Sequence, residues 1–221
     1  MSRLRNCLAS IALACSFGAC TKSASITPVK PVVVNHEQTI DRAMLRAKLA
    51  ERRELNVKRF LAYRESRIYP VLTTPGTEHL WYDAAGHLCA AATMISADWG
   101  REVTMRVGAK DLHLKLADVT SGPLADWILT SGLAKHEIVA IQVPPMGPGD
   151  GGEWQMPGAP IIVDDSQRLY QLYTDVERQI RAMWVANLDD ATDALMKRPD
   201  LARAVMSDQL ASPGMFAQPI G

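Results

Sequence analysis

Residues 78–95 gather the side chains that are best able to do chemistry. They read EHLWYDAAGHLCAAATMI, and we expect them to form a β-hairpin with its bend at residues 83–86. A type I turn followed by a glycine bulge needs a positive φ at Gly86 alone, and it pairs Asp83 with His87 and Trp81 with Cys89. In that register one face of the hairpin carries the four candidate catalytic residues: His79, Asp83, His87 and Cys89.

A thiol, an imidazole and a carboxylate on one face are the parts of a thiol nucleophile with its base and its orienting group. Neighbouring strands hold such side chains within about 5 to 7 Å of each other. Cys89 also lies in the run LCAAATMI, which is typical of a buried structural cysteine, and nothing nearby provides an oxyanion site. The sequence favours the structural interpretation. A thiol hydrolase or other enzyme using Cys89 with His87 or His79 is the alternative.

Other catalytic and metal-binding patterns are incomplete. His36-Glu37 and His136-Glu137 each begin an H-E-x-x-H zinc motif, but Ile40 and Ala140 stand where the second histidine belongs. Residues 189–193, DDATD, resemble the magnesium motif of prenyl-transferring enzymes, yet a second aspartate-rich helix is missing and a solvated acidic face is favoured. The segment GPGDGG lacks the Lys-Ser/Thr of a phosphate loop. We therefore expect no metal and no cofactor.

Two tryptophans are the candidates for binding a partner. Trp81 and Trp154 are not explained by a helical apolar stripe, and Trp154 lies in a Gly/Pro-rich segment, residues 144–160, without an obvious core to enter. An exposed indole can anchor a protein partner or a sugar ring. The alternative for Trp154 is a ring that folds back on its own loop.

The first twenty residues, MSRLRNCLASIALACSFGAC, carry Arg3 and Arg5 ahead of an apolar run that is too short to span a bilayer. The ending Phe17-Gly18-Ala19-Cys20 resembles the lipobox of bacterial lipoprotein precursors, although Phe17 stands where that pattern usually has Leu. The resemblance implies that residues 1–19 are a signal peptide and that Cys20 is lipidated. Cleavage before Cys15 and plain secretion are the alternatives.

A lipidated Cys20 places the protein outside the cytosol, in the cell envelope, attached by its acyl chains on the periplasmic side or at the cell surface. Residues 20–36 then form the anchor and a flexible tether with two prolines. Cys7 and Cys15 leave with the leader, so Cys89 is the one free thiol of the mature chain. An unpaired thiol in an oxidising compartment is usually buried.

The rest of the chain predicts a single α+β domain over residues 37–206, followed by a loose tail at 207–221. Two long helices, about 40–68 and 166–197, are expected to pack together, because the first has nine bases and four acids between residues 41 and 67 and residues 164–193 have seven acids and three bases. The apolar stripe fails at Arg52 and Arg53, which predicts a weakly packed middle turn. Shorter helices are expected at 123–130, 134–142 and 199–206, and residues 100–119 are ambiguous.

Composition limits the function without naming it. The chain has 24 basic and 24 acidic residues, so no net charge attracts nucleic acid. We predict a lipid-anchored cell-envelope protein that acts as a non-catalytic binding or scaffold module. Its partners are the membrane, through the anchor, and an envelope protein or the cell wall. A weaker alternative is that the basic helix itself meets anionic lipid headgroups.

Overall fold

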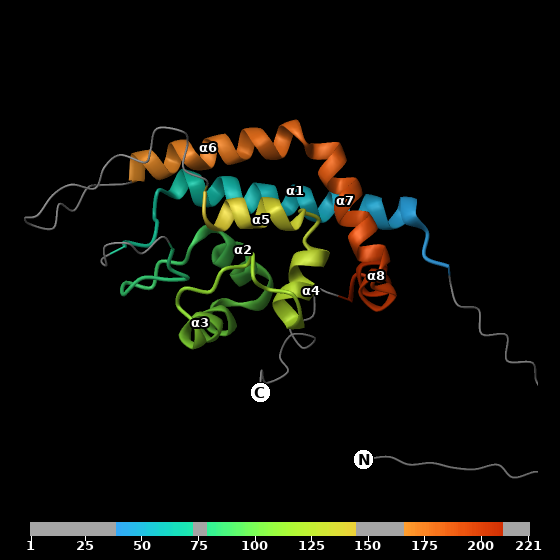
Figure 1. Ribbon diagram of the computed structural model, residues 1–221, viewed down its shortest axis with the longest axis horizontal. Coiled ribbons are helices and arrows are strands. Elements are labelled where there is room, and N and C mark those ends of the chain that lie inside the picture. Colours follow the sequence, from blue (N-terminus) through green and yellow to red (C-terminus); the bar gives the residue numbers. More distant parts are fainter. Residues whose placement is uncertain (1–38, 73–78, 145–165, 210–221) are drawn as a thin grey trace, which may run out of the picture. The chain divides into compact units, whose positions relative to one another are not determined.

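The structure is a computed structural model that describes residues 39–72, 79–144 and 166–209. The chain divides into two units, residues 1–37 and 38–221, and the described residues belong to the second. They form eight helices (Figure 1): α1 Arg42–Ser66, α2 Ala90–Trp99, α3 Arg101–Lys110, α4 Gly122–Thr130, α5 Lys135–Gln142, α6 Ser166–Ala182, α7 Trp184–Met196 and α8 Pro199–Met206. Since these ranges contain no strand, the expected α+β class is wrong and the described fold is all-α.

The predicted β-hairpin is replaced by a tight turn that leads into a helix. Tyr82 and Leu88 form an isolated antiparallel bridge, and the amides of Asp83 and Cys89 donate to the carbonyls of His87 and Trp81. Gly86 has φ of +83°, so the turn has the expected pairing and glycine conformation. The second strand is absent because the alanine-rich run after Cys89 is a strong helix former and becomes α2.

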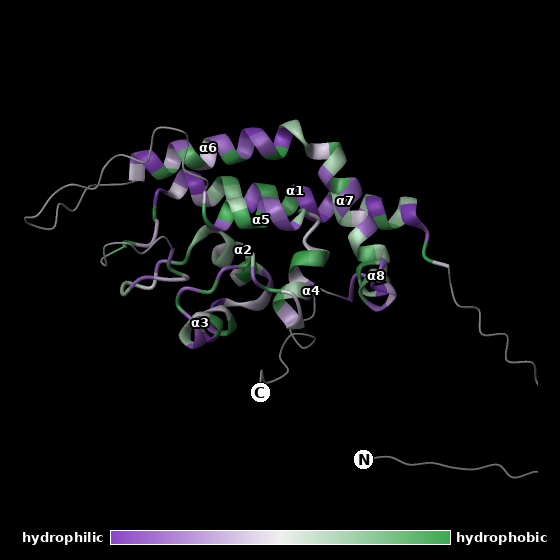
Figure 2. Ribbon diagram, in the orientation of Figure 1, coloured by the Kyte–Doolittle hydropathy of each residue, from purple (hydrophilic) through white to green (hydrophobic). Residues whose placement is uncertain are grey.

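Helix α1 begins at a side-chain cap, where Asp41 accepts hydrogen bonds from the amides of Ala43 and Met44, and it ends at Arg67 in the left-handed region. Figure 1 shows α6 running antiparallel beside α1, and α1 contacts both α6 and α7. The expected packing of the two helical regions is therefore confirmed. In Figure 2 α6 is mostly hydrophilic with hydrophobic stretches between, as an amphipathic helix on a core requires.

Ion pairs follow the predicted charge complementarity between these helices. Arg42 Nε lies 2.8 Å from Asp193 Oδ1, and Arg46 Nε lies 2.6 Å from Asp189 Oδ1. Arg64, at the other end of α1, pairs with Glu177 of α6. The acidic motif at 189–193 thus contributes two carboxylates to the α1–α7 contact.

The second helical region is interrupted, so its prediction as one helix is wrong. α6 ends at Ala182 and α7 begins at Trp184, with Met183 between them. In a continuous helix the Ile180 carbonyl would accept from the amide four residues later. Here it receives Arg53 Nη2 at 3.4 Å, and the Trp184 ring lies 4.6 Å from the same guanidinium. Arg53 therefore stabilises the break.

The remaining helices agree with the sequence patterns within a residue or two. α4 begins at Gly122 with Pro123 in its first turn, α5 ends at Gln142, and α8 covers residues 199–206. The ambiguous segment 100–119 contains α3, followed by turns. At the start of the predicted tail Asp208 pairs with Lys48 at 3.0 Å, and residues 210–221 lie outside the described residues.

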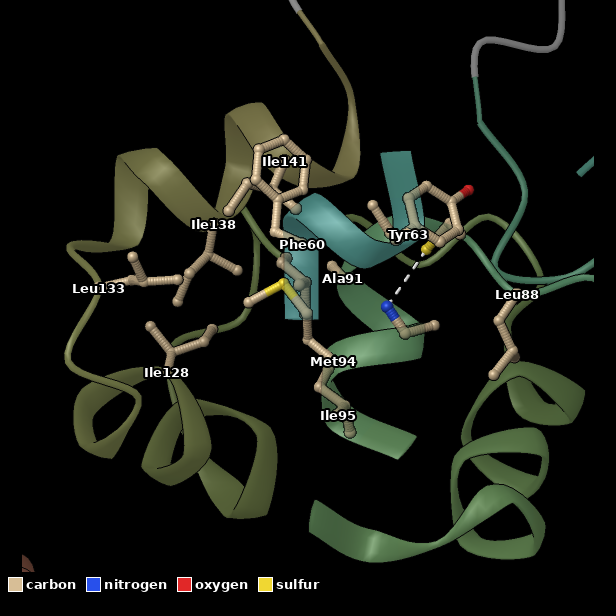
Figure 3. Packing of buried hydrophobic residues seen from close by; sticks show 14 of the residues in the cluster. Phe60, Tyr63, Leu88, Ala91, Met94, Ile95, Ile128, Leu133, Ile138 and Ile141 are labelled. Carbon is tan, nitrogen blue, oxygen red and sulfur yellow. Dashed lines mark hydrogen bonds between the residues drawn. The ribbon is translucent and has the colours of Figure 1, made fainter. Parts of the chain in front are cut away.

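The largest core cluster lies where α1, α2 and α5 meet. Phe60 of α1, Met94 of α2 and Ile138 of α5 are fully buried and point toward one another (Figure 3). Tyr173 of α6 meets the Phe60 ring edge-on, with ring centroids 5.7 Å apart. This core supports one end of the turn at residues 79–89, which carries the candidate site.

Candidate functional site

The Asp83 carboxylate organises the turn in which the candidate catalytic residues lie. Oδ1 accepts from the His87 amide at 2.8 Å, and Oδ2 accepts from the Val71 amide at 3.0 Å. His87 Nδ1 lies 2.9 Å from Oδ2. Burial alone would raise the pKa of Asp83, but these hydrogen bonds favour the carboxylate and hold the pKa below its ordinary value. Asp83 is therefore ionised at neutral pH.

The structure brings His87 and Asp83 together as the sequence predicted. The Asp83 side chain is 5% exposed and the His87 side chain is 42% exposed. This is a buried carboxylate that orients an accessible imidazole, an arrangement that can position a base.

Cys89 has a structural role at the start of α2. It is the N-cap of α2, its Sγ accepts from the Ala92 amide at 3.4 Å (dashed line in Figure 3), and the residue is buried. Burial raises the pKa of the thiol to about 12. Because the thiolate is the nucleophilic form, Cys89 is unreactive in this conformation.

His79 is also held inside the fold. Its Nε2 lies 2.9 Å from Gln142 Nε2, which fixes Nε2 as the acceptor, and the His113 ring contacts the His79 carbonyl at 3.0 Å. Burial, followed by the nearby charges of His113 and Lys115, lowers the pKa of His79 to about 4. The hydrogen bonds of His79 thus join the turn to α5, and neither they nor those of His87 involve the Cys89 thiol.

Of the two tryptophans predicted to bind a partner, Trp81 lies in the described residues and Trp154 does not. Trp81 is fully buried and its Nε1 donates to the Thr104 carbonyl at 3.0 Å, so its ring is part of the α3 contact and is not offered to a partner. That interpretation of Trp81 was wrong because the expected strand face is core. Trp154, the lipidation candidate Cys20 and the segments 1–36 and 145–160 lie outside the described residues.

Exposed apolar side chains gather just before the turn. Ile68, Val71 and Leu72 are 55%, 55% and 43% exposed, within five residues of one another. The Val71 amide donates to Asp83, the carboxylate that orients His87, and the Ile68 amide donates to Ser66 Oγ at 3.2 Å. We refer to Ile68, Val71 and Leu72 as the apolar edge.

Sequence reasoning missed a buried polar network in the described chain that centres on Arg53. Arg53 is fully buried, and Nη1 and Nη2 each lie 2.6 Å from an oxygen of Glu137. Glu137 also accepts from Asn187 Nδ2 at 2.7 Å and from the Ala134 amide at 2.8 Å. The expected weak middle turn of α1 is therefore wrong. The interrupted apolar stripe was the available signal, since a buried arginine requires a buried acid.

The described residues contain neither a cluster of metal-ligating side chains nor a helix that could span a membrane. No group of three or more histidine, cysteine or acidic side chains comes together there as a metal site would require. No helix in the described ranges combines the length and apolar character that a membrane span requires.

Comparison of the chain with protein-family models, with curated proteins and with solved structures finds no match.

Proposed function

We propose that the chain is a lipid-anchored, extracytoplasmic protein that acts as a non-catalytic binding or scaffold module. The anchor rests on the leader, where Arg3 and Arg5 precede a short apolar run that ends in Phe17-Gly18-Ala19-Cys20. The module is the helical unit that begins after residue 37. An envelope protein or the cell wall is its proposed partner.

The burial of Cys89 is the observation that carries the non-catalytic part of this proposal. Its thiol caps α2, and its pKa of about 12 leaves almost no thiolate at neutral pH. His79 is bonded to Gln142, and Asp83 is bonded to two backbone amides. These contacts support a structural role for Cys89, His79 and Asp83, which the sequence analysis considered as candidates for thiol catalysis.

The ion pairs of α1 reduce the positive charge that this helix could offer to a membrane surface. Arg42 and Arg46 pair with acids of α7, and Arg59 Nη1 lies 2.8 Å from Asp98 of α2. Bases that are neutralised within the fold contribute little to the attraction of anionic lipid. This favours attachment through Cys20 over attachment through the basic helix.

Expression of the chain in a bacterial host with a labelled fatty acid tests the anchor. We expect label on the wild-type protein, recovery in the membrane fraction, and a mature chain that begins at Cys20. Cys20→Ala should lose the label and leave the membrane, whereas Cys15→Ala should behave as wild type. An unlabelled, uncleaved wild-type chain in the soluble cell interior contradicts the proposal.

Crosslinking of the anchored protein in intact cells tests the binding role. The binding role is supported if the wild type reproducibly captures an envelope partner and a variant that ends at residue 37, and so lacks the helical unit, does not. Recovery of the same proteins with the bare anchor and tether contradicts a binding role for the helical unit.

A further inference from the structure

Gln142, the last residue of α5, joins that helix to two other stretches of chain through its side-chain amide. Its Oε1 accepts from the Leu116 amide at 2.7 Å, and its Nε2 donates to the Leu114 carbonyl at 2.8 Å. These two backbone groups fix which side of the amide is oxygen and which is nitrogen. The second hydrogen of Nε2 is left for His79 Nε2, 2.9 Å away. We refer to Gln142, His79, Leu114 and Leu116 as the Gln142 clasp.

The Gln142 clasp accommodates His79 only in its neutral form. A proton on His79 Nε2 would set two donors against each other. Turning the Gln142 amide over would give that proton an acceptor, but it would also set an NH2 group against the Leu116 amide and an oxygen against the Leu114 carbonyl. Since His79 is 6% exposed and Gln142 is 3% exposed, water does not readily replace a lost partner there.

Both sides of the Gln142 clasp are held by further contacts. The Trp81 amide donates to the Leu112 carbonyl at 2.7 Å, and His113 Nδ1 lies 3.0 Å from the His79 carbonyl, so these two stretches of chain hold each other. On the other side Ile138 of α5 is fully buried in the core cluster. Because neither side depends on the clasp for its own packing, the clasp can open while the domain stays folded.

We propose that the Gln142 clasp is an acid-sensitive joint, in which protonation of His79 frees the end of α5 from residues 114–116 before the domain unfolds. When the clasp opens, His79 meets water and can hold a proton. A protonated ring does not fit back beside Gln142, so acid shifts the equilibrium toward the open state. The joint does not involve Cys20 or any lipid, so it can fail while the proposed function holds, and the reverse.

The groups that face His79 determine the pH range of this effect. Burial is the largest cause that lowers the pKa of His79, followed by the charges of His113 and Lys115. The Leu114 carbonyl and Asp111 favour the proton, but their smaller effects leave the pKa at about 4 in the closed clasp, against an ordinary value of 6.5. Between those pH values the open state binds a proton that the closed state excludes. Opening therefore becomes easier as the pH falls below 6.5.

Amide hydrogen exchange at Leu116, measured by NMR on the full chain at about pH 7 and about pH 5 and corrected for the intrinsic rate, tests the joint. The pKa values of the closed and open states predict a protection factor that is about twentyfold lower at the acidic pH. His79→Gln keeps an acceptor for Gln142 Nε2 but is not protonated, so its protection should be equal at both pH values. Equal protection in the wild type, or the same fall in His79→Gln, overturns the proposal.

Urea separates opening of the clasp from unfolding of the whole domain. Local opening exposes little new surface, so a low urea concentration should leave exchange at Leu116 unchanged. The amide of Phe60, a fully buried residue of α1, serves as the reference and should exchange faster when urea is added. If urea accelerates Leu116 as steeply as Phe60 at both pH values, the clasp opens only with the domain and the proposal is overturned.

Two further variants keep the test decisive if His79→Gln does not fold. Gln142→Glu places a carboxylate beside His79, which favours the protonated ring, and it should reduce the fall in protection at Leu116. An undiminished fall in this variant contradicts the joint. His113→Gln removes a neighbouring imidazole that bonds to the His79 carbonyl and not to Gln142, so it should retain most of the wild-type fall, and loss of the fall there would assign the effect to His113.

Discussion

Arg53 and Glu137 form a two-pronged ion pair between α1 and α5, in which Nη1 and Nη2 of the guanidinium each lie 2.6 Å from a carboxylate oxygen and neither side chain is more than 3% exposed. The Gly132 carbonyl at 3.2 Å and the Ile180 carbonyl at 3.4 Å accept from the same guanidinium. One side chain of α1 is thus bonded to α5, to α6 and to the turn before α5.

Removal of one partner of this pair is expected to destabilise the protein severely. Arg53→Met leaves the Glu137 carboxylate buried without its counter-ion, which costs about 3 to 5 kcal/mol of unfolding free energy in urea denaturation. The double variant Arg53→Met with Glu137→Met removes both charges and should recover part of that loss. Arg178→Met, in an exposed pair with Asp175, is the control and should change stability by less than about 1 kcal/mol. A single Arg53 variant as mild as this control would refute a stabilising role for the pair.

Gly132 is expected to be intolerant of a side chain. Its φ is +79°, and an added Cβ would overlap the Leu49 carbonyl and lie 2.6 Å from the Arg53 amide nitrogen. We expect Gly132→Ala to cost about 3 kcal/mol or more, because α1 must move away. Gly122→Ala is a matched control with the same φ and open space around its Cβ, so it should cost only about 1 to 2 kcal/mol of backbone strain. Thermal unfolding distinguishes them, and equal losses would show that the close approach to α1 contributes nothing.

Cys89 is expected to resist alkylation in the folded protein. Its burial and its raised pKa, about 12, predict that iodoacetamide reacts far more slowly with native than with urea-denatured protein. Cys89→Ala should also lose about 1 kcal/mol through the missing cap to the Ala92 amide, whereas Cys89→Ser keeps an acceptor there. Native labelling at the denatured rate would revive the thiol-enzyme alternative.

His79 is expected to make the protein less stable as the pH falls. Its folded pKa, about 4, lies below the ordinary value of 6.5, so between those pH values the unfolded chain binds a proton that the folded chain excludes. The loss begins near pH 6.5, grows toward pH 4, and reaches up to about 3 kcal/mol. His79→Gln should flatten this part of the pH profile in urea titrations. His136→Gln changes an exposed imidazole and should keep the wild-type slope, and a wild-type profile without this fall would contradict the burial of a neutral His79.

Local patterns predicted most of the helices, because apolar spacing, caps and prolines act over a few residues. Pro123, Pro199 and the apolar spacing that begins near Ile40 mark helix starts that the structure reproduces within two residues. Net charge also predicted that α1 would meet the acidic helical region. The turn at Gly86 followed from its own few residues, since only glycine readily takes that φ.

The strand predicted after Cys89 failed because the apolar pattern there was ambiguous. Ala90, Ala91 and Ala92 carry no alternation that separates a buried strand from a buried helix, and the helix propensity of alanine together with packing against α1 and α5 selects the helix.

The sequence by itself determined most of the helical segments, the glycine turn and the charges that pair the long helices, since each depends on neighbouring residues or on summed composition. Tertiary structure alone decided the break at Met183, the burial of Arg53 against Glu137 and the bond from Val71 to Asp83. Arg53 and Ile180 are 127 residues apart, and Arg53 and Glu137 are 84 apart. Contacts of that range follow from how helices pack, and no local pattern specifies which carboxylate or carbonyl a buried guanidinium will meet.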